Sequence, residues 1–192
     1  QAYKEGYSHY PSGSGASMLL SGYHPNHKAV ERAFADFLKV DDCILFSSGY
    51  AANIAVTALL GAIKSHAVID KSVHASVYDG LHLSHVSYSR FPHNDLQFLA
   101  KQLKTQSPDA VVITEGIFSM SGHASPLTAM NKLCRSAQTP LLVDEAHSFG
   151  VLGPQGAGAV VLHQLSQQDV PLRIIPLGKA FAAQGAVVAG DK

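Results

Sequence analysis

The chain has 192 residues, of which 46% are hydrophobic and 15% are charged, and its formal net charge is zero. Balanced charge argues against a broad surface for nucleic acid or for acidic membranes, because both partners favour clustered basic residues. The sequence holds no apolar run long enough to span a bilayer, and its first residues are too polar for a signal peptide. We therefore expect one globular domain of a soluble, cytoplasmic protein.

The cysteines and histidines are not arranged in the patterns typical of disulfides or metal sites. Cys43 and Cys134 are isolated within apolar segments, which predicts reduced thiols in the core. His24 and His27 could share a helix face, but no cysteine or carboxylate nearby completes a metal set. The sequence therefore predicts neither a disulfide nor a metal site.

The first forty residues combine a glycine-rich stretch with an amphipathic pattern. Residues 1–23 contain four glycines among many Ser and Tyr, which predicts a loop. Gly13 and Gly15 resemble the start of a dinucleotide-binding motif, but the third glycine and a preceding strand are missing. Across residues 26–38 apolar side chains recur at helical spacing, which predicts an amphipathic helix.

A strand, a turn and a helix follow at residues 43–62. Residues 43–46 are apolar, small residues break the run, and residues 51–62 are almost entirely apolar. The first N–H groups of a helix have no internal partner and carry partial positive charge, so an anion could bind at Gly49 and Tyr50. The same pattern is equally typical of a plain connection.

Strand and helix patterns alternate along the rest of the chain. They comprise a strand at 67–70, a helix opening at 72, a helix with an Asn94 to Gln97 capping box, a strand at 110–114, a helix starting at Ser125 and Pro126, a strand at 141–143 and a last strand at 185–189. Such alternation predicts a three-layer α/β/α fold, in which helices cover both faces of a mainly parallel sheet.

The strand at 141–143 ends at Asp144, and His147 follows it. Ligands of open α/β sheets bind beyond the carboxyl ends of the strands, although such an aspartate can equally cap the next helix. Further on, Lys179 provides an amine nucleophile. An aspartate at a strand end, a nearby histidine and a lysine together suit pyridoxal phosphate (PLP) chemistry. A nucleotide-dependent helicase is excluded, because the phosphate loop that it needs is broken at Arg173 and Ala180.

Several motifs of the chain occur in the order typical of one enzyme family. They are residues 17–23, Phe46 to Asn53, His74-Ala75-Ser76, His93-Asn94-Asp95, Thr114 to Met120, Val143 to His147 and Gly178 to Phe181. With these motifs the chain resembles the α-oxoamine synthases, which are PLP enzymes of fold type I. The resemblance implies the large, cofactor-binding domain of the aspartate-aminotransferase-like fold.

The resemblance also implies a role for each residue of a set around PLP. The implied roles are Lys179 as the Schiff-base lysine, Asp144 as partner of the pyridine nitrogen, His147 near the phenolic oxygen, His74 stacked on the ring, Gly49 and Tyr50 as backbone contacts of the phosphate, and Ser119 as a further cofactor contact. Lys179, His74 and Asp144 are the expected catalytic residues, with Lys179 removing the Cα proton.

Within the family the chain is most similar to members that join L-alanine to a pimeloyl thioester. The thioester is carried by coenzyme A or acyl carrier protein, CO₂ is lost, and the product 8-amino-7-oxononanoate serves biotin synthesis. Family members are homodimers, which implies a dimer here. Glycine C-acetyltransferase is the first alternative, but it more often has Cys-Phe-Asp in place of Gly49-Tyr50-Ala51. Serine palmitoyltransferase and 5-aminolevulinate synthase are further alternatives.

The chain departs from the family pattern in two ways. Pro176 stands where the family usually has a Thr or Ser that contacts the phosphate, and proline has neither a hydroxyl nor an N–H. The resemblance also covers only about half of a typical member. We expect residues 1–192 to be part of the large domain, without the family's N-terminal segment and small C-terminal domain. A non-catalytic binding module or inactive fragment is the alternative of a different class.

Overall fold

The computed structural model describes residues 2–105 and 109–191 of the protein. Within these residues one sheet has the strand order β1-β7-β6-β5-β4-β2-β3. The strands are β1 Asp42–Phe46, β2 His66–Asp70, β3 Tyr88–Phe91, β4 Ala110–Glu115, β5 Leu141–Asp144, β6 Leu172–Pro176 and β7 Ala186–Gly190. Neighbouring strands from β3 to β6 are parallel, whereas β7 runs antiparallel to both β6 and β1. The prediction of a mainly parallel sheet is confirmed.

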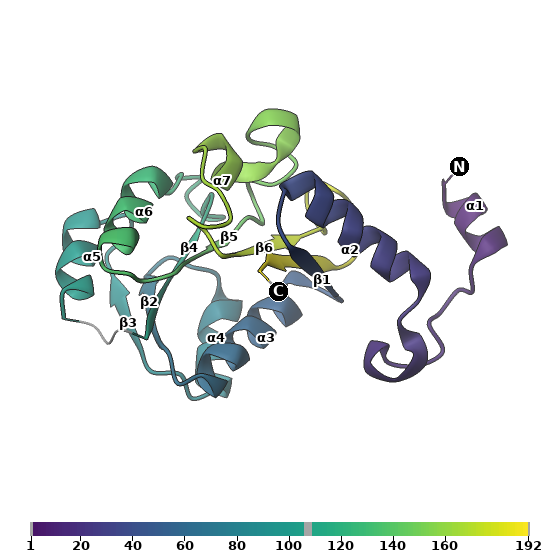
Figure 1. The fold of residues 1–192 in the computed structure, drawn as a ribbon, viewed down its shortest axis with the longest axis horizontal. Helices are drawn as coiled ribbons and strands as arrows, with labels where there is room; N and C mark the ends of the chain where they lie inside the picture. Colours follow the sequence, from purple (N-terminus) through teal and green to yellow (C-terminus); the bar gives the residue numbers. More distant parts are fainter. Residues whose placement is uncertain (1, 106–108, 192) are drawn as a thin grey trace.

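Helices cover both faces of the sheet (Figure 1). The helical segments are α1 Ala2–His9, a π-helical turn Met18–Gly22, α2 Pro25–Leu38, α3 Gly49–Ala62, α4 Ala75–Leu83, α5 Leu96–Leu103, α6 Leu127–Ser136, a 3₁₀ turn Pro154–Gly156 and α7 Gly158–Leu162. Helices α3 and α4 pack on one face, where their apolar side chains form a buried cluster with strand residues. Helices α2, α5, α6 and α7 supply the clusters of the opposite face. The predicted α/β/α layering is therefore confirmed.

Strand β6 shows how the sequence divides its side chains between the two faces. Successive side chains of a strand point to opposite sides of the sheet. Ile174 accordingly joins the cluster beneath α3 and α4, and Ile175 joins the cluster with α2. Both are 0% exposed, which explains why these two neighbouring positions are both apolar instead of alternating with polar residues.

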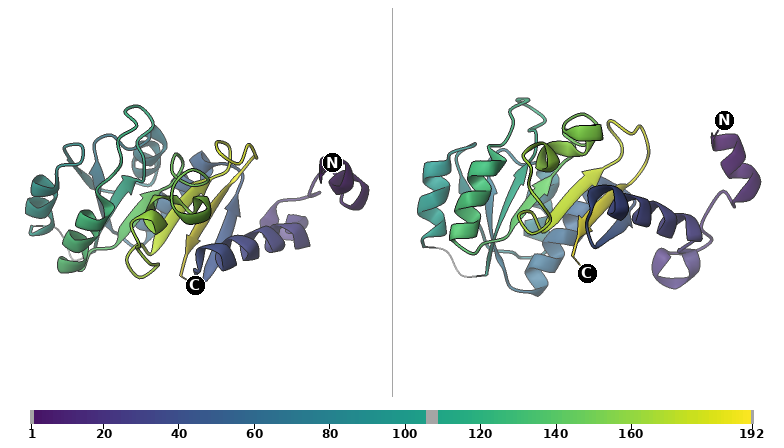
Figure 2. Two further views of the ribbon diagram at one scale, coloured as in Figure 1. Left: turned by 90° about the horizontal axis from the view of Figure 1, so that it is seen from above. Right: turned by 45° about the horizontal axis from the view of Figure 1, so that its top comes forward.

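The N-terminal segment differs from its prediction. Residues 1–23 were expected to form a loop, but the structure has helix α1 and the turn Met18–Gly22 there. Helix α1 lies away from the sheet, on an extended arm (Figure 2). The sequence AYKEGYSH contains a glycine and few aliphatic residues, so it lacks the apolar stripe by which an amphipathic helix is recognised.

Three further details were wrong or missing in the sequence prediction. Strand β3 was not predicted, because it is short, partly polar and lies at the edge of the sheet. Helix α7 was not predicted either. The cap of α5 is Asp95, which accepts the N–H of Phe98 at 2.9 Å, and not Asn94. Asn94 instead has a left-handed backbone with φ of 57°, and its N–H donates to Asp70.

Both cysteines are free and buried, as expected. Burial raises the pKa of Cys43 and of Cys134 to about 12, so both remain thiols. Among the described residues no group of three His, Cys, Asp or Glu side chains could hold a metal ion. No helix in the same part of the chain has the length and apolar character needed to cross a membrane.

Candidate active site

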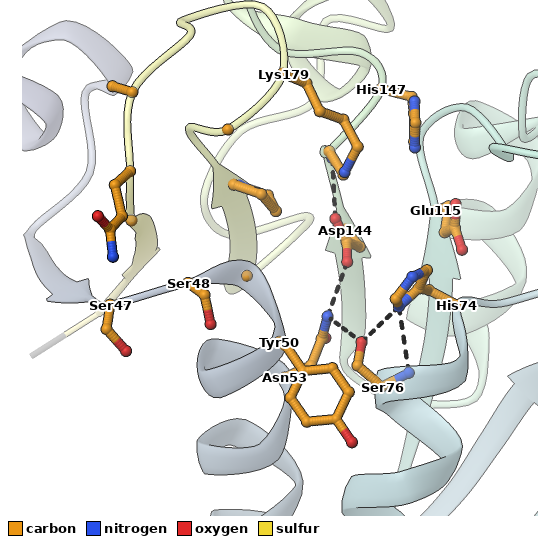
Figure 3. A pocket seen from close by; sticks show the side chains of 17 residues that line it. Ser47, Ser48, Tyr50, Asn53, His74, Ser76, Glu115, Asp144, His147 and Lys179 are labelled. Carbon is orange, nitrogen blue, oxygen red and sulfur yellow. Dashed lines mark hydrogen bonds between the residues drawn. The ribbon is translucent and has the colours of Figure 1, made fainter.

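A pocket of ≈460 Å³ opens at the edge of the sheet where the parallel strands end. It is lined by the N-termini of α3 and α4, by the last residues of β4 and β5, and by the segment that connects β6 to β7 (Figure 3). This is the edge at which open α/β sheets bind their ligands, and the volume suits a small molecule.

The pocket gathers most of the residues that the sequence singled out. Six of them line it, namely Gly49, Tyr50, His74, Asp144, His147 and Lys179. Ser119 is exposed in the connection between β4 and α6 and is not among the lining residues. Its backbone N–H lies against the Glu115 carboxyl, which does line the pocket.

The N-terminus of α3 forms one end of the pocket. The Ser48 hydroxyl caps the helix by accepting the N–H of Ala51 at 3.1 Å, and the N–H groups of Gly49 and Tyr50 have no acceptor within the helix. A Cβ at position 49 would lie 2.6 Å from Cγ of Pro176, so only glycine fits there. Glycine at this position therefore lets Pro176 pack against the start of α3 at this end of the pocket.

Tyr50 directs its side chain along α3 toward α4. Its hydroxyl donates to Oδ2 of Asp79 at 2.8 Å, and this hydrogen bond is the main reason why the pKa of Tyr50 is raised. Because the hydroxyl is committed to Asp79, the backbone N–H is the group of Tyr50 that remains for a ligand at the helix end.

Asp144 lies at the floor of the pocket at the end of β5 and is 4% exposed. Its Oδ1 accepts the N–H of Ala146 at 2.9 Å, and its Oδ2 accepts the side-chain amide of Asn53 at 3.0 Å. Burial raises the pKa of Asp144, while these hydrogen bonds and the charge of Lys179 oppose the change. Asp144 is therefore a rigidly held carboxyl that faces the pocket.

A hydrogen-bonded chain connects Asp144 to His74 (Figure 3). The Asn53 amide also donates to Oγ of Ser76 at 3.0 Å, and Oγ lies 2.8 Å from Nδ1 of His74. Neither Asn53 nor Ser76 had a role predicted from the sequence. A signal for Asn53 existed, because it is a polar residue within the almost entirely apolar residues 51–62.

Glu115 is a second buried carboxyl beside Asp144, and the sequence analysis assigned it no function. The two residues are register partners at the ends of β4 and β5. Burial, and then the charge of Asp144, raise the pKa of Glu115 to about 7, although the amides of His74 and Ser119 act in the opposite direction. In the part of the chain that the structure describes, its Oε1 is buried without a hydrogen-bond partner.

Lys179 enters the pocket from the β6–β7 connection, where its carbonyl accepts the N–H of Ala182 at 3.0 Å. Figure 3 shows its side chain reaching toward Asp144 and His147. Its positive charge lowers the pKa of Asp144 and of Glu115. The pKa of His147 is lowered mainly by burial and further by Lys179. An amine and two carboxyls thus share one electrostatic environment.

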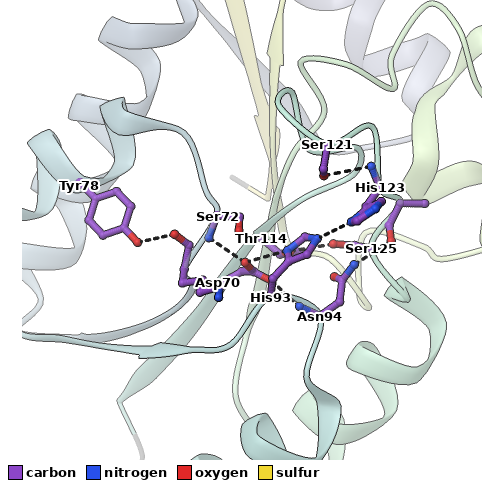
Figure 4. A network of polar contacts seen from close by, with 11 residues as sticks. Asp70, Ser72, Tyr78, His93, Asn94, Thr114, Ser121, His123 and Ser125 are labelled. Atoms are coloured by element: carbon purple, nitrogen blue, oxygen red, sulfur yellow. Dashed lines mark hydrogen bonds and ion pairs between the residues drawn. The ribbon is translucent and has the colours of Figure 1, made fainter.

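A second polar network holds the loops beside the pocket (Figure 4). Asp70, at the end of β2, accepts the backbone N–H groups of Ser72 and Asn94, each at 2.8 Å. His93 lies 3.2 Å from Asp70 through Nδ1 and 3.1 Å from His123 through Nε2. The network therefore ties the β2–α4 and β3–α5 connections to the loop that carries Ser119.

Comparison with models of known families matches residues 4–192 to aminotransferase class I and II. The chain belongs to this family. Both Asp144 and Lys179 lie within the matched region.

Two of the relatives that the chain matches bear the same enzyme name. The chain is 40% identical over 179 residues to the 8-amino-7-oxononanoate synthase of Marinobacter nauticus, which covers 93% of this chain and 45% of that protein. It is 43% identical over 182 residues to the enzyme of the same name from Stenotrophomonas maltophilia, with 93% and 44% covered. The chain therefore spans about half the length of these relatives.

Comparison with solved structures leads to the same family. A serine palmitoyltransferase from S. paucimobilis with a bound PLP–myriocin aldimine superposes with a TM-score of 0.93 at 31% identity, covering 100% of this chain and 48% of that one. An 8-amino-7-oxononanoate synthase from Francisella tularensis superposes with a TM-score of 0.85 at 36% identity, covering 100% and 53%. The resemblance to α-oxoamine synthases and the fold type I architecture are confirmed.

The donor set of the pocket fits PLP on its own chemistry. PLP needs an amine for its aldehyde, an anion for its protonated ring nitrogen and backbone donors for its phosphate. The pocket supplies Lys179, the buried carboxyl of Asp144 and the first N–H groups of α3, which have no acceptor within the helix.

Proposed function

We propose that the protein is a PLP-dependent acyltransferase that condenses L-alanine with a pimeloyl thioester, with loss of CO₂, to give 8-amino-7-oxononanoate for biotin synthesis. One observation carries this proposal: an amine, a buried carboxyl and an open helix N-terminus converge on one pocket. Relatives at 40% and 43% identity that bear the name 8-amino-7-oxononanoate synthase support the substrates.

Each residue of the pocket then has a defined task. The Gly49 and Tyr50 N–H groups would hold the phosphate, the Asp144 carboxylate would hold the protonated ring nitrogen, and His147 would hold the phenolic oxygen. His74 would hold the cofactor ring, and Ser119, which lies outside the lining residues of the pocket, would be a further cofactor contact from the β4–α6 loop. When bound, PLP supplies an aldehyde for amines and a ring that accepts the electron pair left by a broken Cα bond.

Lys179 moves the proton in this proposal. Its amine would hold the cofactor and, when free, would accept the Cα proton of L-alanine. The negative charge of Asp144 favours the protonated ring nitrogen, and burial strengthens the interaction because water is excluded. His74 orients the carboxylate or carbonyl oxygen of the substrates. The thioester is carried by coenzyme A or acyl carrier protein.

The structural comparison favours one alternative within the family. The serine palmitoyltransferase superposes with the higher TM-score, 0.93, although its sequence identity of 31% is below the 36% of the Francisella enzyme. An α-oxoamine synthase that uses serine is therefore the second candidate. Parallel assays of the complete protein with L-alanine, glycine and L-serine, each with pimeloyl and longer acyl thioesters, distinguish the candidates.

PLP binding provides the first test. We expect added PLP to give a visible absorbance band that borohydride reduces, and peptide mapping to find the label on Lys179. The Lys179→Ala variant should lose the labelled peptide completely, because alanine offers no amine. Lys64→Ala, at an exposed lysine outside the pocket, is the matched control and should label like the unchanged protein. A label on another lysine, or none on the complete protein, contradicts the proposal.

Pro176 provides a second test, because it stands at the phosphate end of the pocket beside Gly49. We expect Pro176→Thr to tighten PLP binding roughly tenfold in an absorbance titration, since a hydroxyl donor to the phosphate contributes about 1 kcal/mol or more. Pro176→Val is the control, because it has the shape of threonine without the hydroxyl. Equal dissociation constants for the two variants would exclude a phosphate contact at this position.

Two properties of the complete protein belong to the same proposal. We propose that it is a homodimer, and the exposed Leu19 and Leu20, 94% and 82% accessible, support a buried role in an assembly. Analytical sedimentation measures the state, and a monomer at micromolar concentration contradicts it. We also propose a cytoplasmic location, which the two free thiols support.

A further inference from the structure

In the series of hydrogen bonds from Asp144 to His74, the donor and the acceptor of each bond can be assigned in only one way. A carboxylate only accepts hydrogen bonds, so the group of Asn53 that faces Oδ2 of Asp144 at 3.0 Å is its NH₂. The second N–H of this NH₂ points to Oγ of Ser76 at 3.0 Å. The Ser76 oxygen therefore accepts from Asn53, and its own proton is free to be donated elsewhere.

The two contacts of Nδ1 with Ser76 define the tautomer of His74. Oγ of Ser76 lies 2.8 Å from Nδ1 of His74, and the backbone N–H of Ser76 donates to the same Nδ1 at 3.2 Å. A backbone N–H cannot accept, so Nδ1 must be the acceptor in both contacts. In a neutral imidazole the proton then lies on Nε2.

Burial makes this arrangement rigid. Asn53 is 3% exposed, Ser76 is 0% exposed and Asp144 is 4% exposed, so water does not compete for these groups. His74 is exposed toward the pocket, and in the described part of the chain its Nε2 has no hydrogen-bond partner. The free edge of the ring is thus available to a ligand.

We propose that Asn53 and Ser76 are positioning residues that fix His74 as the Nε2–H tautomer, so that it donates a hydrogen bond to a carboxylate or carbonyl oxygen of the substrate. The identity of that substrate rests on the proposed function, whereas the tautomer does not. In this state His74 orients an oxygen and does not take up a proton at Nε2. Asp144, as an acceptor only, determines which groups donate in the hydrogen bonds from Asn53 to His74.

Nitrogen-15 NMR of the purified protein without PLP tests the tautomer directly. Long-range proton–nitrogen correlations distinguish a protonated ring nitrogen from an unprotonated one, and His74→Gln identifies the His74 signals by their loss. We expect an unprotonated Nδ1 and a protonated Nε2. A major form with the proton on Nδ1 overturns the proposal, whether or not PLP binds. Failure of PLP binding in a separate absorbance titration overturns only the proposed function.

Variants test the positioning role by the same spectrum. Ser76→Ala removes the hydroxyl between Asn53 and Nδ1, and Asp144→Asn removes the charge that imposes the sense of the chain. We expect Asp144→Asn to admit the Nδ1–H tautomer, and Ser76→Ala to admit a smaller share of it, because the backbone N–H at position 76 still faces Nδ1. Ser125→Ala is the matched control: Ser125 is also buried, 1% exposed, but its Oγ contacts Thr114 at 2.9 Å, so the His74 signals should not move. An unchanged tautomer in both folded variants would show that Asn53 and Ser76 do not position His74.

Discussion

Replacement of Arg173 by leucine is expected to lower the free energy of unfolding by about 3–5 kcal/mol, the cost of leaving a buried charge without its partner. Arg173 on β6 is 2% exposed and donates Nε and Nη2 to Oε1 of Glu145 at 3.0 and 2.6 Å. Glu145 is 0% exposed, so its carboxylate cannot regain hydration when the guanidinium is lost. Urea unfolding followed by circular dichroism measures the change.

The surface ion pair of Arg135 with Asp169 is the matched control for this prediction. It has a similar N–O distance of 2.9 Å, but the Arg135 side chain is 70% exposed. Arg135→Leu should therefore change stability by less than about 1 kcal/mol. Equal losses in the two variants would mean that burial of the Arg173 pair adds nothing.

A double variant separates the two parts of the Glu145 environment. Changing Arg173 and Glu145 to leucine together removes both charges and should recover part of the loss. Recovery should be incomplete, because Glu145 also accepts the backbone N–H groups of Ala159 and Val160, at 2.7 and 3.3 Å, at the start of α7. Further destabilisation in the double variant would contradict this explanation.

Replacement of Glu115 by glutamine is expected to remove a pH dependence of stability. The pKa of Glu115 rises from 4.5 to about 7 in the folded protein, so between these values the folded state holds a proton that the unfolded state has lost. Stability therefore falls as pH rises from about 4.5 to about 7, and the full cost remains above that. Glutamine keeps the shape and cannot ionise.

The difference between the two proteins should grow with pH to at most roughly 3 kcal/mol in favour of Glu115→Gln above pH 7. Urea unfolding at a series of pH values between 4 and 8 measures it. Asp36→Asn is the control, since the Asp36 side chain is 65% exposed and its variant should follow the unchanged protein. Parallel stability curves for Glu115→Gln and the unchanged protein across this range would show that Glu115 is not protonated in the fold.

The sequence by itself determined the fold class and most of the elements, because these depend on local patterns. Apolar runs at β5 and helical spacing in α2 are properties of neighbouring residues, so both were predicted correctly. Asp144 and Lys179 could be assigned to one site because their chemistry suits PLP and because both lie in motifs of the family that the chain resembles.

Only the tertiary structure decided which side chains meet. Asn53 and Asp144 are 91 positions apart in the chain, and Glu115 becomes the neighbour of Asp144 only through the β4–β5 register. The partner of Glu145 is Arg173, 28 positions away. From the sequence, Arg173 served only to exclude the phosphate loop of a helicase. Such contacts depend on strand order and register, which no local pattern encodes. They therefore could not be predicted from the sequence.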